Sequence, residues 1–214
     1  AGLPDGQPLV RSAARHNRIV FAVAERLLDP AYEIPGELEP ETGDYVRKVL
    51  EHEAVEFYPG DDYTVYEPRG HYAGDAELER YFRAIKWLAR RIYRVEDRRH
   101  PEEADVELAA AAMLAQMVTG DPLTEAAWSR LDDVTRLVVG SADSITPVLM
   151  ARALEATFGT AFEPRLLEEP ANRARLRAEL AGDDYPASEI VPVPLAYPDQ
   201  IPPKYVQILG ERYL

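Results

Sequence analysis

The fold is decided by residues 101–159, which read PEEADVELAAAAMLAQMVTGDPLTEAAWSRLDDVTRLVVGSADSITPVLMARALEATFG. Apolar residues recur there at helical spacing, and proline and glycine interrupt the pattern at intervals. Proline is favoured in the first turn of a helix, where its missing N–H is not needed, and glycine just past the last turn. The pattern predicts helices over residues 101–118, 122–139 and 147–158, each followed by a glycine at 120, 140 or 159.

The connections between these helices are short, which favours antiparallel packing of neighbours. In the first helix, the alanine run at residues 109–112 indicates close contact with another helix, because alanine lets two backbones approach. The middle helix carries an apolar stripe that we expect to point inward, formed by Leu123, Ala127, Leu131, Val134 and Val138.

Outward from this stretch, the same signals predict four further helices, over residues 12–28, 44–57, 76–92 and 170–181. The helix after Asp75 has the clearest apolar period in the chain, and aspartate is a favoured capping residue. Residues 58–74 are rich in aromatic residues and turn formers. We expect an ordered loop there, because aromatic burial can offset the entropy of ordering, with three rings packed on helices: Tyr63, Tyr66 and Tyr72.

These elements predict an all-α fold, an array of antiparallel helices that could form part of an α/α toroid-like domain. Helices should cover more than half of residues 1–182. Residues 1–214 are expected to be one domain or a fragment of a larger one, with a helical core at 11–182 and a proline-rich, irregular segment at 183–214. Two prolines confine any extended stretch at residues 190–196 to a sheet edge.

Composition narrows the classes of partner. The formal net charge is -14, whereas a general nucleic-acid binder shows a basic footprint, so no nucleic-acid partner is expected. Cysteine is absent, which excludes thiolate chemistry and disulfides. No apolar run approaches the roughly 20 residues of a membrane-spanning helix. The pattern of a signal peptide is absent as well.

Three segments carry a family resemblance. The first is DYTVYEPRGHY at residues 62–72, which leads into a helix that contains YFRA; the second is VVGSADSITP at 138–147, and the third is LGERY at 209–213. In order and spacing they resemble the domain of unknown function 3160 family, which comprises large, mostly secreted prokaryotic proteins. The chain resembles the earlier part of such proteins. The resemblance implies a fold and an extracellular or cell-surface location, but no catalytic residues, because the family has no established activity.

One candidate binding site is the loop that carries Arg69, His71 and Tyr72, just before the helix that follows Asp75. A helix N-terminus favours anions, so Arg69 and His71 could complete a clamp for a carboxylate or another anion. His71 could also serve as a general acid or base. The alternative is structural: both side chains would then tie the loop to the helices by hydrogen bonds.

A second candidate is a basic stripe on the outer face of the same helix, where Arg83, Trp87, Arg90 and Arg94 follow one another at spacings of four, three and four. Residues 80–99 contain eight basic and two acidic residues. Such a stripe could hold an acidic glycan or another polyanion. Charged stripes are more often solvated or paired with acidic residues of the same fold.

Two functions follow as hypotheses. The chain could be part of an extracellular helical scaffold or binding protein that engages a surface polymer or another protein. Alternatively, it could be part of an all-α enzyme that acts on polysaccharide, with a groove lined by Tyr63, Arg69, His71, Tyr72 and Trp87. Neighbouring acids such as Asp61 and Asp62 do not by themselves supply the facing carboxylates of a glycosidase. No spacing indicates a metal site or a cofactor. The scaffold is therefore favoured.

The last ten residues suggest a partner. Six of them are large apolar or aromatic residues, whereas a free terminus is usually polar and frayed. We expect a second polypeptide to bury this end and the basic stripe. The simplest such partner is the remainder of the same precursor, or else a subunit of a complex.

Overall fold

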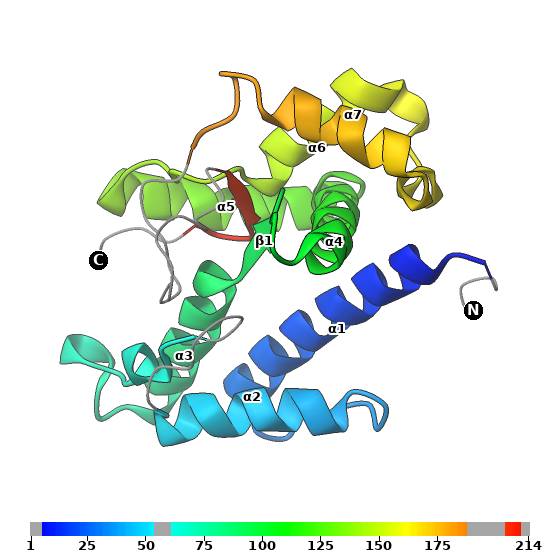
Figure 1. Ribbon diagram of the computed structural model, residues 1–214. Helices are drawn as coiled ribbons and strands as arrows, with labels where there is room; N and C mark the ends of the chain where they lie inside the picture. The colour runs from blue at the N-terminus through cyan, green and yellow to red at the C-terminus, as the bar shows by residue number, and fades with distance from the viewer. Residues whose placement is uncertain (1–5, 54–60, 188–203, 211–214) are drawn as a thin grey trace.

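The computed structural model describes residues 6–53, 61–187 and 204–210. Most of these residues are helical, which confirms the all-α class and the expected helical share of residues 1–182. The α-helices within these ranges are α1 (Pro8–Leu28), α2 (Glu39–Glu51), α3 (Ala76–Arg90), α4 (Pro101–Thr119), α5 (Pro122–Val139), α6 (Pro147–Phe158) and α7 (Pro170–Leu180) (Figure 1). The shorter elements are the 3-10 turns η1 (Tyr63–Tyr66), η2 (Gly70–Tyr72), η3 (Gly159–Ala161) and η4 (Pro164–Glu168), and the strands β1 (Ile92–Arg94) and β2 (Tyr205–Gln207).

The helix ends match the predicted positions of proline and glycine closely in α4, α5 and α6. Each of these helices begins at its proline and ends one residue before its glycine. α2 differs from the prediction, because it begins at Glu39 instead of residue 44. Pro40 fits its first turn, where the carboxylates of Glu39 and Glu41 also favour the helix dipole. It ends before His52, whose left-handed backbone (φ 52°) stops the helix. α1 likewise begins at a proline, four residues earlier than predicted.

The core is divided into two apolar clusters that share α1. The α4 cluster packs Leu108 and Leu114 of α4 against residues of α1, α6 and α7, among them Val20, Met150 and Leu176. The α3 cluster lies at the other end of α1, where α2, α3 and η1 contribute Val49, Tyr63, Tyr66 and Trp87. In Figure 1, α4 lies between α1 and the α6–α7 pair, and α2 and α3 lie at the opposite end of the molecule.

Helix α4 is the centre of the larger cluster. Its alanines 109–112 are at most 1% exposed, so the predicted close helix contact is confirmed. Asn17 of α1 reaches this run and donates from Nδ2 to the carbonyl oxygen of Ala110 at 2.9 Å. α1 and α3 run antiparallel, since Trp87 bonds to Val20 whereas the later Tyr93 packs on the earlier His16.

The two strands form an antiparallel pair that sequence reasoning did not predict. Ile92 pairs with Gln207 and Arg94 with Tyr205, so the end of α3 is joined to the end of the described chain. Ile145 extends the pairing: its N–H donates to Tyr205 O, and its carbonyl accepts from Gln207 N–H, both at 3.1 Å. The pairing joins segments that are 60 or more residues apart, which local patterns do not reveal.

This junction bears on one expectation about the C-terminal segment. Tyr205, Val206 and Ile208 are at most 5% exposed, and the chain's own helices and strand bury them. The chain itself therefore accounts for the burial of residues 205–210, whereas a second polypeptide at the end of residues 205–214 stays a prediction. Residues 211–214 and the possible extended segment at 190–196 lie outside the described residues.

We expect His16 to make stability fall at acid pH. Burial lowers its pKa below 6.5; Glu107 opposes this effect, whereas Arg91 and Arg94 reinforce it. As the pH falls through 6.5, the unfolded chain gains a proton at this position and the folded chain does not, so unfolding becomes easier. Urea unfolding at pH 7.5 and 5.5 measures this loss, which His16→Gln should reduce.

The matched control is Leu28→Gln, at a side chain that is 49% exposed. This change removes no titratable group, so the pH dependence should stay as it is in the natural sequence. Equal pH dependence in the natural sequence and His16→Gln would contradict this assignment.

Candidate functional site

The structure places two of the candidate binding residues, Tyr63 and Trp87, in the apolar core. Tyr63 and Trp87 are each 1% exposed, within the α3 cluster. The indole N–H of Trp87 donates to Val20 O at 2.9 Å, and the Tyr63 ring stacks on Tyr66 at 6.0 Å between centroids. Tyr72 is half-buried, with its ring 5.2 Å from that of Phe82. The predicted packing of the tyrosines is thus confirmed, but Trp87 does not lie on an outer face.

Arg90 belongs to a buried charged network around Asp61. Asp61 is fully buried and accepts hydrogen bonds from Arg90 Nε at 3.0 Å and from Tyr66 Oη at 2.7 Å. Arg91 also pairs with this carboxylate, and its guanidinium lies 4.0 Å from the centroid of the Trp87 ring. Burial raises the pKa of Tyr66, so its hydroxyl remains a donor to Asp61. The network ties the aromatic loop to the end of α3.

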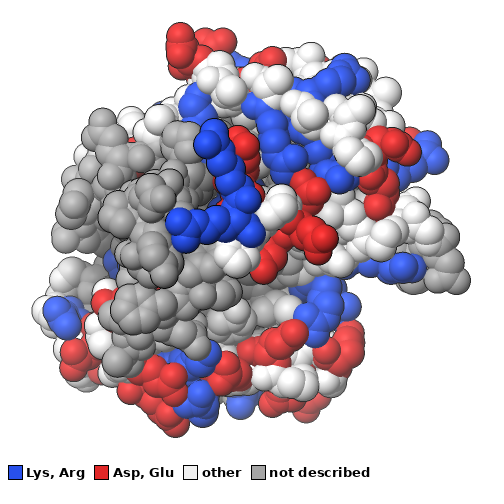
Figure 2. Space-filling view, in the orientation of Figure 1, with Lys and Arg blue, Asp and Glu red and all other residues white. Residues whose placement is uncertain are grey.

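The remaining residues of the basic stripe also have acidic partners. Arg83 is half-buried and pairs with Glu79 at 3.4 Å. Arg94 is buried, and its Nε donates to Glu107 at 2.7 Å. Basic and acidic side chains lie interspersed on the face in Figure 2. The arginines of the stripe are thus paired with acidic residues of the same chain, as the structural alternative expects.

The loop candidates Arg69 and His71 are exposed on the surface. Arg69, 76% exposed, lies 3.5 Å from Glu67, and the His71 ring packs on Tyr72 at 4.1 Å between centroids. The N-terminus of α3 is capped by Asp75, whose Oδ1 accepts from the N–H groups of residues 77 and 78 at 2.9 and 3.1 Å. An anion at this position would have to displace a carboxylate that already satisfies these donors.

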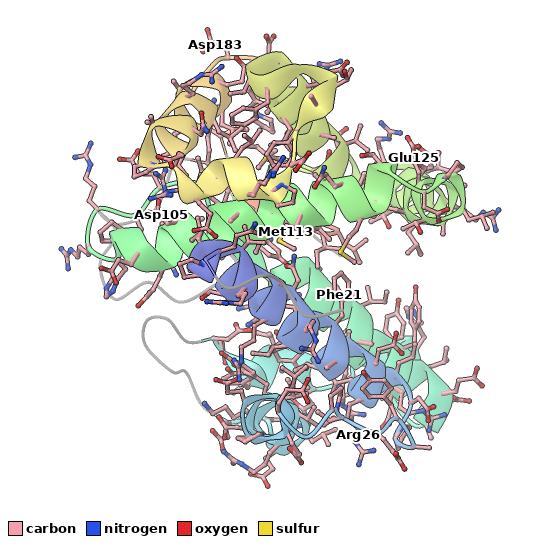
Figure 3. All side chains as sticks on the ribbon, turned by 90° about the vertical axis from the view of Figure 1, so that its right-hand side faces the viewer. Phe21, Arg26, Asp105, Met113, Glu125 and Asp183 are labelled. Carbon is pink, nitrogen blue, oxygen red and sulfur yellow. The ribbon has the colours of Figure 1, made fainter. Side chains whose placement is uncertain are left out.

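Helix α5 has the opposite orientation from the one predicted. Its apolar stripe points to solvent: Leu123 is 82% exposed, Leu131 43%, Val134 60% and Leu137 87%. Figures 1 and 3 show why: α5 runs across the end of α4 instead of folding back along it. On the side of α5 that faces the fold, Trp128 is half-buried and donates from Nε1 to Ile208 O at 2.7 Å.

The polar face of α5 lines a cleft of about 440 Å³, closed on its other side by residues 141–149. Glu125, Asp132 and Arg136 lie on this face, at spacings of seven and four. From the opposite wall Ser144 lines the cleft; the residue is 1% exposed and its Oγ has no hydrogen-bond partner. No group of three histidine or acidic residues in the described chain could hold a metal ion.

The cleft lies where two of the family-like segments meet. Gly210 has a φ of 64° and lies against Ala142 and Ser144; a Cβ there would be 2.8 Å from that of Ala142. Only glycine fits this position without displacement, because it lacks a Cβ and tolerates positive φ. Both segments are distinctive in the sequence, but their contact does not follow from it. Ser144 carried no signal of its own, since a serine beside a helix cap usually serves the turn.

A second hollow is an apolar groove of about 380 Å³ between α1, α4 and residues 32–38. Phe21 and Met113 line it and lie near the crossing of α1 and α4 in Figure 3. Asn17 borders the groove, and its Oδ1 is buried without a hydrogen-bond partner. No sequence pattern indicates a role for these residues. Among the described residues, no helix is both long and apolar enough to cross a membrane.

Comparison with known proteins gives one match. A family model described as protein of unknown function (DUF3160) matches residues 4–214, which is essentially the whole chain. No curated protein and no solved structure matches the chain.

Proposed function

The chain belongs to the DUF3160 family of proteins of unknown function, and from its own contacts we propose that it is a helical scaffold that binds another polypeptide through α5. It would act outside the cell, as part of a larger protein or complex. The binding surface is the outward apolar face of α5, formed by Leu123, Ala127, Leu131, Val134 and Leu137.

The exposure of this face supports the proposal. Soluble monomers rarely leave a contiguous row of large apolar side chains in water, and such rows commonly mark interaction sites. Four of the side chains are between 43% and 87% exposed and share one side of an 18-residue helix. A partner that presents an apolar helix would bury them by ordinary ridge-and-groove packing.

The position of α5 supports the same interpretation. Trp128 and residues 141–149 hold its polar side, so the helix is fixed with its apolar side outward. A partner therefore meets an already ordered surface and has little α5 backbone to immobilise, which lowers the entropy that binding costs. The polysaccharide enzyme lacks comparable support, because Tyr63 and Trp87 are buried and do not line an accessible groove.

The proposal predicts that a crosslinker placed on α5 captures one partner. A photoreactive phenylalanine at Leu137, introduced in the natural host, should give a discrete adduct with a single polypeptide. Leu137 is 87% exposed, so the substitution should leave the melting temperature unchanged. The same group at the exposed Glu155 of α6 is the control and should give no such adduct.

Leucine-to-glutamine changes then measure the affinity for the captured partner. Burial of a leucine contributes about 1.5–3 kcal/mol, so the pair Leu123→Gln and Leu137→Gln should weaken binding by at least about 100-fold. Leu50→Gln on α2 is the matched control, because Leu50 is 52% exposed but lies off this face. Equal adducts at residues 137 and 155, or equal affinity in all variants, would rule the scaffold surface out.

A further inference from the structure

We propose that the polypeptide bound by the apolar face of α5 is a second copy of this chain, with the two α5 helices packed antiparallel. This inference rests on the scaffold surface proposed above and names its partner. Figure 3 shows α5 at the edge of the molecule, where its outer side is open to another molecule. Two features of the helix carry the inference: a basic residue within the apolar face, and a face that complements itself.

A basic residue interrupts the apolar face. Arg130 is seven residues from both Leu123 and Leu137, so the three side chains share one line along the helix. Arg130 is exposed and makes no ion pair or hydrogen bond within the part of the chain that the structure describes. A partner that covers the face would bury this charge, which is unfavourable unless the partner supplies an acidic group. The occupant is therefore an apolar surface that carries a carboxylate opposite Arg130.

This chain carries such a carboxylate beside the same face. Asp133 follows Arg130 by three residues, so the two side chains lie on one flank of the helix. Arg136 donates to Oδ1 of Asp133, and both of these side chains are more than half exposed. A carboxylate has about four acceptor sites, so Asp133 can also accept from a guanidinium of another molecule.

Two-fold symmetry joins these charges. In a symmetric antiparallel pair, each flank of one helix faces the same flank of the other. Arg130 of each copy then lies beside Asp133 of the other copy, which forms two equivalent ion pairs. A parallel pair would instead place the two Arg130 side chains against each other, and like charges in contact oppose association. The charges therefore favour a second copy in the antiparallel orientation.

The apolar side chains suit the same arrangement. With the two-fold axis near Leu131, Ala127 of one copy lies between Val134 and Leu137 of the other. The alanine leaves room for these two larger side chains, and the reciprocal contact repeats on the other side of the axis. The face is thus complementary to itself in shape as well as in charge.

Sedimentation velocity on the purified chain tests the inference. The contact uses one 18-residue helix, about 27 Å long, from each copy, so we expect a reversible dimer with a dissociation constant on the order of 10 to 100 μM. Roughly 0.15 M salt screens the net charge of -14 on each copy. The pair Leu123→Gln and Leu137→Gln should weaken self-association at least about 10-fold. A chain that stays monomeric to about 1 mM, or a dimer that this variant leaves unchanged, would overturn the inference.

Two charge reversals test the predicted ion pairs. Arg130→Glu and Asp133→Lys each place like charges together in the symmetric pair, so each variant alone should self-associate at least about 10-fold more weakly. An equimolar mixture should recover an affinity within about 3-fold of the natural sequence, because both pairs then unite opposite charges. Recovery also shows that both variants are folded.

The matched control for the reversals is Arg165→Glu on η4, a 64% exposed position off α5 that changes the net charge equally and should have no effect. A mixture that associates no better than either variant alone would refute the antiparallel pairing.

The photoreactive group at Leu137 separates this inference from the scaffold proposal. An adduct of two copies of the chain in the natural host would support both. An adduct with a different polypeptide, together with a monomeric purified chain, would overturn the second copy and leave the scaffold surface standing. The absence of any adduct would count against both.

Discussion

Replacing Asp61 with asparagine is expected to lower the free energy of unfolding by about 3–5 kcal/mol, the usual cost of breaking a buried ion pair from one side. Asp61 is fully buried between two guanidiniums whose side chains are 7% and 16% exposed, those of Arg90 and Arg91. Without the carboxylate, both cations lose their common partner and remain largely shielded from water. Urea unfolding followed by circular dichroism measures the change.

Two further variants calibrate this result. Tyr66→Phe removes one neutral donor to Asp61, and we expect it to cost about 1–2 kcal/mol. Asp133→Asn breaks an ion pair with Arg136 whose side chains are more than half exposed, and it should cost at most about 1 kcal/mol. A loss in Asp61→Asn no larger than that in Asp133→Asn would show that the buried network does not stabilise the fold.

Replacing Trp87 with alanine should cost about 3–5 kcal/mol, as expected for a large aromatic side chain removed from a core. The indole is 1% exposed, donates to Val20 O and lies under the guanidinium of Arg91. Its removal leaves a cavity where α1, α3 and η1 meet, and one backbone carbonyl loses a partner. Chemical unfolding at several urea concentrations gives the difference.

The chain contains two tryptophans, so Trp128→Ala is a matched control. Trp128 is half-buried and supports α5, and its replacement should cost about 1–2 kcal/mol, mainly through the hydrogen bond to Ile208 O. If the two alanine variants were equally stable, Trp87 could not be the centre of the α3 cluster.

Helix positions could be predicted from the sequence wherever the signal is local. Pro101, Pro122 and Pro147 mark helix starts because the proline ring suits the first turn whatever surrounds it. The pairing of Ile92 with Gln207 has no local signal, since three-residue strands have no periodicity and their partners are far apart in sequence. The start of α2 was predicted at residue 44 instead of Glu39, because the residues before it contain prolines and a glycine, which are typical of a loop.

Which face of a helix is buried was harder to predict than the helix itself. Leu78 and Tyr81 belong to the apolar period of the helix after Asp75, which by itself predicts burial, yet they are 41% and 42% exposed in α3. Trp87 and Arg90 of the same helix are buried instead. A basic residue is assigned to the surface unless its partner is known. Asp61 lies in a segment rich in turn formers, and nothing in the sequence indicates that two arginines pair with it.

The candidate cleft could be predicted only in part. The segment around Ser144 and the one around Gly210 were recognised as distinctive, but spacing within each says nothing about contact between them. Their contact depends on β2 and on Ile145, whose pairing is set by tertiary packing. The outward face of α5 was missed for the same reason: an apolar stripe predicts burial without identifying the partner that buries it.

α1 contributes Ala13 and Val20 to one apolar cluster and Val23 and Leu27 to the other. The two clusters therefore cannot be exchanged as separate gene segments. A recombination event that exchanged one cluster would separate half of α1 from the side chains that cover it. A substitution that disturbs the packing of α1 would therefore affect both clusters at once. The two clusters would therefore be inherited as a single unit, with α1 as the element that neither can lose.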